Sequence, residues 1–99
     1  MSSSFTQGTL VTVIGEAILQ DRLIQLLTKL KVSGYTIIPA QGAGSHGKQM
    51  GDIAGYNTNI EIKTVVNSET SNQLLENLKP LQATHALIAF RQSVDGLFD

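Results

Sequence analysis

The chain has 99 residues, 41% of them apolar, and a formal net charge of −1. This length suits a single domain, residues 1–99, and the near-neutral charge gives no global field that would favour nucleic acid or a membrane surface. The chain has no cysteine, which excludes disulfides, thiolate metal sites and cysteine catalysis. It shows no secretory signal and no apolar run near the roughly 20 residues that cross a bilayer, so we expect an intracellular protein.

The first third of the chain predicts a tail, a strand and an amphipathic helix. Residues 1–8 are expected to form a flexible tail, and the β-branched run Thr9–Ile14 predicts the strand. Residues 16–34 predict the helix because leucines recur along one face of a 3.6-residue period. Gly34 is the expected left-handed residue that stops this helix. The apolar stripe consists of Leu19, Leu23, Leu26, Leu27 and Leu30.

A short strand and a long glycine-rich segment follow. Tyr35–Pro39 predicts the strand, with Pro39 at its end or at a sheet edge because proline cannot donate to a ladder. Residues 40–58 contain five of the nine glycines and show neither helical nor strand periodicity. We predict one long flexible loop here, and loops longer than about 12–15 residues in a compact domain are usually functional or disordered.

The remaining sequence predicts a strand, a helix and a last strand. Asn59–Val66 alternates apolar and polar residues and predicts the third strand. The next segment predicts a helix that Ser68 caps at its N-terminus and Pro80 ends. Thr84–Gln92 is the fourth predicted strand, and residues 93–99 are expected to form a C-terminal tail.

The predicted order of elements, β-α-β-β-α-β, indicates an α+β ferredoxin-like fold. Two helices would cover one face of a four-stranded antiparallel sheet, with the long loop between the second and third strands. The other face should be polar if it meets water. Whichever of its two alternating sets of side chains each strand turns outward, however, that outward set still includes apolar residues. We therefore expect the subunits of an oligomer to cover this face; exposure of scattered apolar side chains is the alternative. The residues concerned are Val11, Val13, Ile38, Val65, Leu87 and Ala89.

The stretch GAGSHGK matches two phosphate-binding patterns. Gly42, Gly44 and Gly47 give G-x-G-x-x-G, and Gly42, Gly47 and Lys48 begin a P-loop. Both motifs need a helix behind the glycines, but no amphipathic repeat follows them. A P-loop also requires Ser or Thr after the lysine, where this chain has Gln49. Neither motif is therefore predicted in its usual form.

The chemistry of this stretch still suits an anion. Closely spaced glycines let backbone N–H groups approach an anion without steric hindrance, and Ser45, His46 and Lys48 add donors beside them. A phosphate can bind such a loop without a helix behind it. The alternative is a surface hairpin whose polar side chains are solvated, and the residues alone do not decide between the two.

The segment GYTIIPAQGAGSHGK resembles the entrance to the long T-loop of the PII signalling family. Gly34, Thr36, Gly42 and Gly44 match the family's Gly-x-Thr and Gly-x-Gly at the family's spacing. The resemblance implies a ferredoxin-like subunit in a homotrimer, adenine nucleotides in the clefts between subunits, and a T-loop that engages a target. The expected target contacts are three apolar residues of the loop, Met50, Ile53 and Tyr56. The expected nucleotide-binding residues are Gly34, Thr36, Gly42, Ala43, Gly44, Ser45, His46, Lys48 and Arg91.

Departures from the nitrogen-regulatory members make the chain look more like a divergent PII-like group. The loop is shorter and lacks the tyrosine that those proteins modify, no Gly-Lys-rich segment follows the second predicted helix, and Arg91 is the only basic residue after Lys79. The divergent group includes cyanobacterial proteins that regulate a sodium-dependent bicarbonate transporter and proteins associated with carboxysomes.

A turn like GGKGSR in the transporter-linked members is replaced here by QGAGSH, so one lysine and one arginine are missing. Arginine offers phosphate a charged fork, whereas a neutral histidine offers a single donor. We therefore expect AMP, ADP or a cyclic adenine nucleotide as ligand, with little added affinity for ATP.

Other functions of the same topology fit less well. No Ser/His/Asp or paired-carboxylate arrangement indicates an enzyme, and an acylphosphatase-like hydrolase would need an arginine before Arg22, the first in the chain. An RNA-recognition domain would carry aromatic residues on its central strands, and a trimeric metal-tolerance protein of the CutA type lacks a glycine-rich central loop. We expect a non-enzymatic cytoplasmic sensor that requires no cofactor. The resemblance implies that it reaches a membrane only through a partner such as a bicarbonate transporter.

Overall fold

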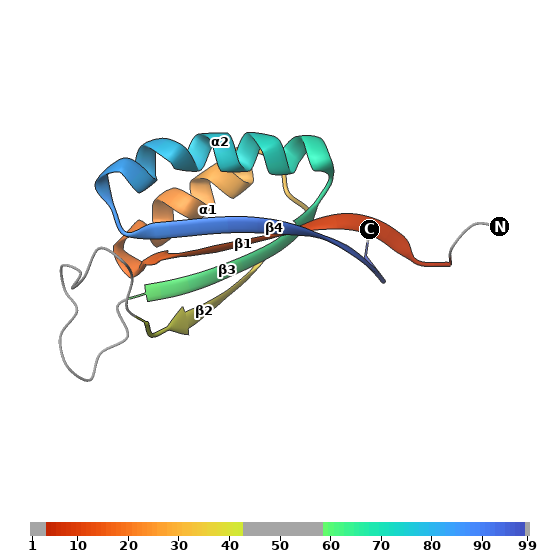
Figure 1. Cartoon of the computed structure of the whole chain (residues 1–99), viewed down its shortest axis with the longest axis horizontal. Helices are drawn as coiled ribbons and strands as arrows, with labels where there is room; N and C mark the ends of the chain where they lie inside the picture. The colour runs from red at the N-terminus through yellow and green to blue at the C-terminus, as the bar shows by residue number, and fades with distance from the viewer. Residues whose placement is uncertain (1–3, 43–58, 99) are drawn as a thin grey trace.

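The computed structural model describes residues 4–42 and 59–98. Within them, strands and helices follow the order β-α-β-β-α-β that the sequence predicts, with a short 3-10 turn before the first helix. Figure 1 shows both helices on the same side of the sheet. The elements are β1 (Thr6–Glu16), η1 (Ala17–Leu19), α1 (Gln20–Lys29), β2 (Thr36–Ala40), β3 (Asn59–Val66), α2 (Ser68–Thr84) and β4 (Leu87–Gly96).

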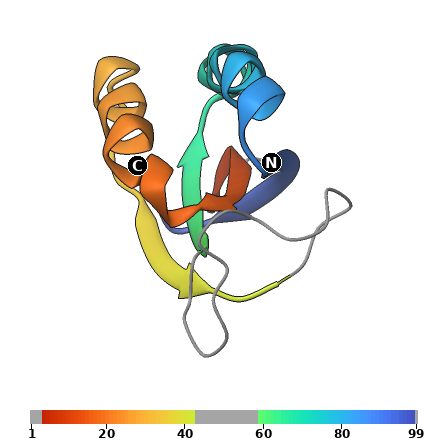
Figure 2. The same cartoon turned by 90° about the vertical axis from the view of Figure 1, so that its left-hand side faces the viewer.

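The four strands form one antiparallel sheet in the order β2-β3-β1-β4. β1 and β3 therefore lie in the middle, and β2 and β4 are the two edges. The view along the sheet in Figure 2 shows α1 and α2 next to each other above one face. The predicted ferredoxin-like α+β fold is confirmed.

The core lies between the sheet and the helices, and strand alternation decides which side chains enter it. Val11 and Val13 of β1 are 0% and 2% exposed, and Val13 pairs with the buried Ile62 of β3 on the same face. Leucines along one stripe of each helix pack against this face. The buried apolar residues are Val11, Val13, Leu19, Leu23, Leu27, Ile60, Ile62, Leu74, Leu78, Leu81 and Leu87.

The first helix begins later than the leucine spacing predicts. Glu16 keeps an extended conformation at the end of β1, and the 3-10 turn follows it. The Glu16 carboxylate accepts a hydrogen bond from the Ala86 backbone N–H at 2.7 Å. This bond ties the end of β1 to the segment before β4, and the regular helix starts only at Gln20.

The prediction that Gly34 stops α1 is wrong, because Lys31 takes the left-handed conformation. Lys31 has a φ of 59°. Its N–H donates to the Thr28 carbonyl, and the Val32 N–H donates to the Leu27 carbonyl. These two bonds form a Schellman motif, which ends a helix with one left-handed residue, usually glycine. The helix is therefore already closed three residues before Gly34.

α2 also differs from its predicted bounds at both ends. Its N-cap is Asn67 rather than Ser68, and the Asn67 side-chain oxygen accepts a hydrogen bond from the Thr70 N–H at 2.7 Å. Pro80 does not end the helix, which continues through the next turn. Proline removes one backbone hydrogen bond from a helix, but Leu81 in that next turn is buried against the core. Packing thus holds the last turn in place.

β1 and β4 extend each other, so parts of both predicted tails are strand. Thr6–Gly8 pairs with Val94–Gly96, although the sequence predicts tails over residues 1–8 and 93–99. Figure 1 shows the two strands running together past the helices. A distant partner strand supplies the backbone hydrogen bonds here, and local sequence does not reveal that partner.

The face opposite the helices exposes several large apolar side chains. Ile88 and Phe90 of β4 are 54% and 44% exposed, and Ile38 of β2 is 47% exposed. Of the six apolar residues whose face the sequence leaves undecided, Ile38 and Val65 lie here, and the other four face the helices. We call this surface the open face. Its apolar residues are Leu10, Ile14, Ile38, Val65, Ile88, Phe90 and Val94.

Most of the connection between β2 and β3 lies outside the described residues. Ala40 belongs to β2, one residue beyond the predicted end at Pro39, and Gln41 and Gly42 follow it. The prediction of one long flexible loop over residues 40–58 therefore falls mainly on residues that the structure does not describe.

Candidate functional site

A pocket of about 420 Å³ opens where β2 begins. Gly34 and Thr36, the two residues of the Gly-x-Thr sequence, both line it. Its wall combines apolar side chains, hydroxyl groups and one lysine. The lining residues are Leu10, Ser33, Gly34, Tyr35, Thr36, Lys63, Thr64, Val65 and Phe98.

A hydrogen bond from β3 positions the chain at this pocket. After the turn that ends α1, the chain passes Ser33 and Gly34 before entering β2. The Thr64 hydroxyl donates to the Gly34 carbonyl at 2.6 Å, and Thr64 is 3% exposed. Because a buried residue holds this carbonyl, the entrance to β2 has a defined position relative to β3.

Thr36 and Lys63 are direct partners across β2 and β3, and both point to the open face. The Thr36 side chain is exposed and makes no hydrogen bond within the described residues. Lys63 Nζ lies 3.6 Å from Glu61 Oε2, and the lysine side chain is 54% exposed. Exposed ion pairs contribute about 0–1 kcal/mol, so Lys63 can exchange this carboxylate for an anionic ligand at little cost. The pocket thus offers a ligand one cation and the hydroxyl of Thr36, together with those of Ser33 and Tyr35.

The apolar part of the wall comes from segments that are distant in the sequence. Leu10 of β1 and Val65 of β3 pair directly on the open face. Tyr35, just before β2, is 42% exposed, and Phe98, after β4, is half-buried. An apolar wall with a few placed polar groups is typical of sites for small organic ligands.

A second pocket, of about 230 Å³, shares part of its wall with the first. Ser33, Val65 and Phe98 line both pockets. The rest of its lining comes from the start of β1, the turn after α1, and the junction of β3 with α2. These further residues are Gln7, Gly8, Lys31, Val32, Val66, Asn67 and Thr70.

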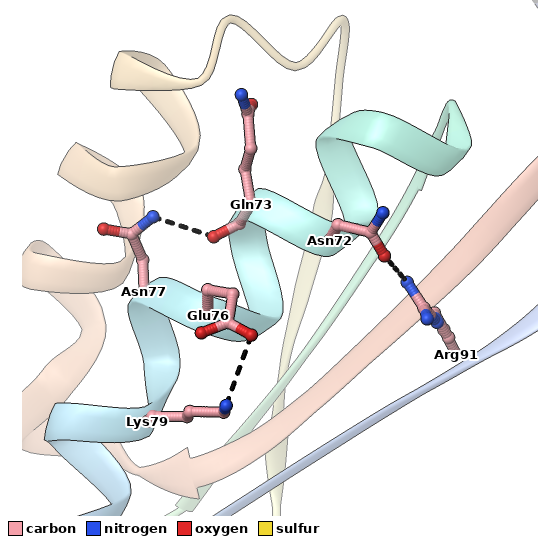
Figure 3. Close-up of polar contacts among 6 residues, drawn as sticks. All are labelled: Asn72, Gln73, Glu76, Asn77, Lys79 and Arg91. Carbon is pink, nitrogen blue, oxygen red and sulfur yellow. Dashed lines mark hydrogen bonds and ion pairs between the residues drawn. The ribbon is translucent and has the colours of Figure 1, made fainter.

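Arg91 lies away from both pockets. It belongs to β4, at the opposite edge of the sheet from β2, and it pairs with Val11 on the face that the helices cover. Its Nη1 donates to the Ser71 hydroxyl at 2.8 Å. It also donates to the Asn72 side-chain oxygen, the contact that Figure 3 shows. Within one subunit the guanidinium is therefore held against α2 and is not brought together with Thr36.

The other expected binding residues are only partly described. Gly42 is exposed and follows the end of β2, so it lies at the opposite end of that strand from Thr36. The remaining eight lie outside the described residues: Ala43, Gly44, Ser45, His46, Lys48, Met50, Ile53 and Tyr56.

Sequence reasoning missed several lining residues. Lys63 and Val65 share a face in the alternating pattern of the third strand, and this signal was available. Linking that face to Thr36 requires the register of β2 on β3, which the sequence does not contain. Phe98 follows the last strand without any periodic pattern, so nothing local identifies it.

The described residues also bear on two other classes of site. Within residues 4–42 and 59–98, no group of three or more His, Asp or Glu side chains is placed to hold a metal ion. No helix in this part of the chain has the length and apolar character needed to cross a membrane.

Known proteins resemble this chain over nearly its whole length. Residues 8–95 match the model of the family described as nitrogen regulatory protein P-II. A protein from Thermus thermophilus, described as PII-like and signalling, is 28% identical, with 96% of this chain and 94% of that chain covered and a TM-score of 0.78. CPII from Thiomonas intermedia, a nitrogen regulatory PII-like protein solved with ADP, AMP and bicarbonate, is 26% identical, with coverages of 94% and 98% and a TM-score of 0.80. No match was found among curated proteins.

Proposed function

Because this chain belongs to the nitrogen regulatory protein P-II family, we propose that it is a non-enzymatic signalling protein that binds an adenine nucleotide. Three copies form a trimer, and the nucleotide lies in the cleft between two of them. Residues 40–58 contact the regulated partner, for which a bicarbonate transporter is the first candidate. The protein acts in the cytoplasm and reaches the membrane through that partner.

The pocket at the start of β2 is the observation that carries this proposal. Its apolar wall, with Leu10 and Val65, suits a purine base, and the free hydroxyl of Thr36 can donate to the base or the ribose. β2 has five residues, which corresponds to about 16 Å at roughly 3.3 Å per strand residue. A nucleotide along this strand would have its base in the pocket and its phosphate toward Gly42.

The open face supports the trimer. It exposes three large apolar side chains, Ile38, Ile88 and Phe90, on one side of a sheet whose other side already carries both helices. Exposed apolar surface of this kind marks interaction sites when it is contiguous. Burial of this face between copies also places the β2 edge of one subunit beside its neighbour, where a cleft would form.

The known ligands of the relative support the choice of nucleotide. CPII was solved with ADP, AMP and bicarbonate, and also with ADP and bicarbonate. Among the described residues, Lys63 is the only cationic side chain that lines the candidate pocket. A second or third phosphate therefore gains few charge-assisted hydrogen bonds in the described part of the site. The affinity for ATP should accordingly not greatly exceed the affinities for AMP and ADP.

Calorimetric titration with AMP, ADP, ATP, cyclic AMP and GMP, combined with light scattering of the free protein, tests the proposal. We expect three times the 10.6 kDa chain mass, binding of AMP and ADP with similar affinities, and weaker binding of GMP. A monomer that binds no adenine nucleotide would overturn the proposal. An ATP affinity more than about tenfold above that of AMP would overturn only the choice of ligand.

A further inference from the structure

We propose that Phe98 is an aromatic wall of the candidate site and stacks on the base of the bound ligand. This makes Phe98 a specificity residue that selects a flat heteroaromatic ring over other groups of similar polarity. The inference rests on the proposed function, because it names a contact within the same site.

Two glycines form the seat of the Phe98 ring. Gly8 and Gly96 lie on adjacent strands of the β1–β4 pair, and a side chain at either position would point toward the ring. A Cβ on Gly8 would lie 2.8 Å from Phe98 Cε1 and 2.7 Å from Val65 Cγ1, and a Cβ on Gly96 would lie 3.1 Å from Phe98 Cε2. The ring therefore occupies the space that two side chains would otherwise fill. The ring is thus positioned by packing against these two strands.

The seated ring borders two pockets. Phe98 lines the 420 Å³ pocket that holds Thr36, and it also lines the 230 Å³ pocket beside the turn after α1. It is half-buried, so part of the ring stays open to a ligand. In the larger pocket it lies with Leu10 and Val65, both apolar.

The polar groups of this pocket can address the edges of a base, which leaves its face to stacking. The Thr64 hydroxyl already donates to the Gly34 carbonyl, whereas the hydroxyls of Ser33, Tyr35 and Thr36 can bond the edges of a base or the ribose. An aromatic side chain can stack on any base, because every base has a π-face. An aromatic wall beside Leu10 and Val65 can thus hold the face of a base while hydroxyl groups bond its edges.

The first experiment measures AMP affinity by calorimetry for the wild type and for two substitutions of Phe98. Phe98→Leu keeps apolar bulk at the seat but removes the ring, and Phe98→Ala removes both. We expect both variants to bind AMP about tenfold more weakly or worse. Ribose 5-phosphate, which has no base, should bind the wild type and both variants equally weakly.

A second variant displaces the ring without changing it. Gly8→Ala places a methyl group 2.8 Å from the Phe98 ring and 2.7 Å from Val65 Cγ1. Because it crowds two apolar walls of the pocket, we expect a loss of AMP affinity at least as large as that of Phe98→Leu. Gly15→Ala is the matched control on the same strand, because its Cβ would meet Leu87 at an ordinary 3.4 Å. This control should keep wild-type affinity, and circular dichroism melts should show that all variants are folded.

A spectroscopic readout separates stacking from a structural effect. The chain has no tryptophan, so Phe98→Trp introduces a single reporter at the seat. We expect AMP to quench its fluorescence saturably, with the dissociation constant that calorimetry gives, and ribose 5-phosphate to leave it unchanged.

The possible failures are distinguishable. If the wild type binds no adenine nucleotide, the proposed function fails and this inference falls with it. If the wild type binds AMP but Phe98→Leu binds equally well, the inference alone is overturned, since apolar bulk then suffices. Tryptophan fluorescence that stays constant at saturating AMP would overturn it as well.

Discussion

At the scale of single residues, the end of α1 shows why the prediction of Gly34 as its left-handed residue is wrong. A glycine after a helix usually supplies the left-handed conformation, and Gly34 is the first glycine after the leucine stripe. The structure gives this conformation to Lys31, because the Val32 N–H then reaches the Leu27 carbonyl. Gly34 instead presents its carbonyl to Thr64, a role that depends on the backbone and that any residue type can fill.

The left-handed Lys31 leads to a stability prediction. Lys31→Gly should raise the free energy of unfolding by about 0.5–1 kcal/mol, because glycine adopts this conformation without the steric cost of a Cβ. Urea unfolding followed by circular dichroism measures the change. Lys29→Gly, within the last turn of α1, should lower the free energy by about 1 kcal/mol. Equal destabilisation by both substitutions would contradict the assignment of the cap.

The free hydroxyl of Thr36 leads to a binding prediction. Thr36→Val keeps the shape and β propensity of the side chain but removes the hydroxyl, so AMP affinity should fall about two- to tenfold, the value of one hydrogen bond. Calorimetry measures this change against Thr28→Val, an exposed site on α1 whose affinity should match the wild type. An unchanged affinity in Thr36→Val would remove this residue from the site.

At the scale of elements, all six predicted strands and helices exist, because local signals mark them: β-branched runs, the alternation of the third strand and the leucine stripe of the first helix. Their ends were less predictable, since they depend on partners elsewhere in the chain. Thr6–Gly8 is strand because Val94–Gly96 lies beside it, and neither segment has a pattern of its own. α2 passes Pro80 because Leu81 packs in the core, which overrides the local preference.

Pro80 leads to a prediction about α2. Pro80→Ala restores an N–H that can donate to the carbonyl four residues earlier, so the free energy of unfolding should rise by about 1–2 kcal/mol after the gain in unfolded-state entropy is subtracted. Thermal and urea melts measure the change. Lys79→Ala is the neighbouring control; it removes only an exposed 3.2 Å pair with Glu76 (Figure 3) and should change stability by less than about 0.5 kcal/mol.

At the scale of the whole molecule, the layered fold was predictable and the pocket was only partly so. Element order alone indicates a sheet with two helices on one face. The Gly-x-Thr sequence located one wall of the pocket, at Gly34 and Thr36. The other walls come from β1, β3 and the segment after β4, and only strand order and register bring these together.

The open face leads to a prediction about assembly. Ile88→Asp places a charge on a 54% exposed apolar position of this face. In the proposed trimer that charge would be buried without a partner, so the variant should elute as a monomer in size-exclusion chromatography with light scattering. Ile18→Asp is the control, because Ile18 is 79% exposed but lies in the 3-10 turn outside the sheet. A trimeric Ile88→Asp variant would show that the subunits meet elsewhere.

The position of β2 at the edge of the sheet has a consequence for the timing of amide exchange. Among the described residues, β2 pairs with β3 alone. Pro39 has no N–H, and those of the other four backbone N–H groups that face away from the sheet should take up deuterium fast. The others, bonded to β3, should exchange far more slowly. A nucleotide or a neighbouring subunit seated along this edge would slow only the first set. The rate of deuterium uptake in this five-residue strand would then report whether a ligand or a subunit occupies the edge.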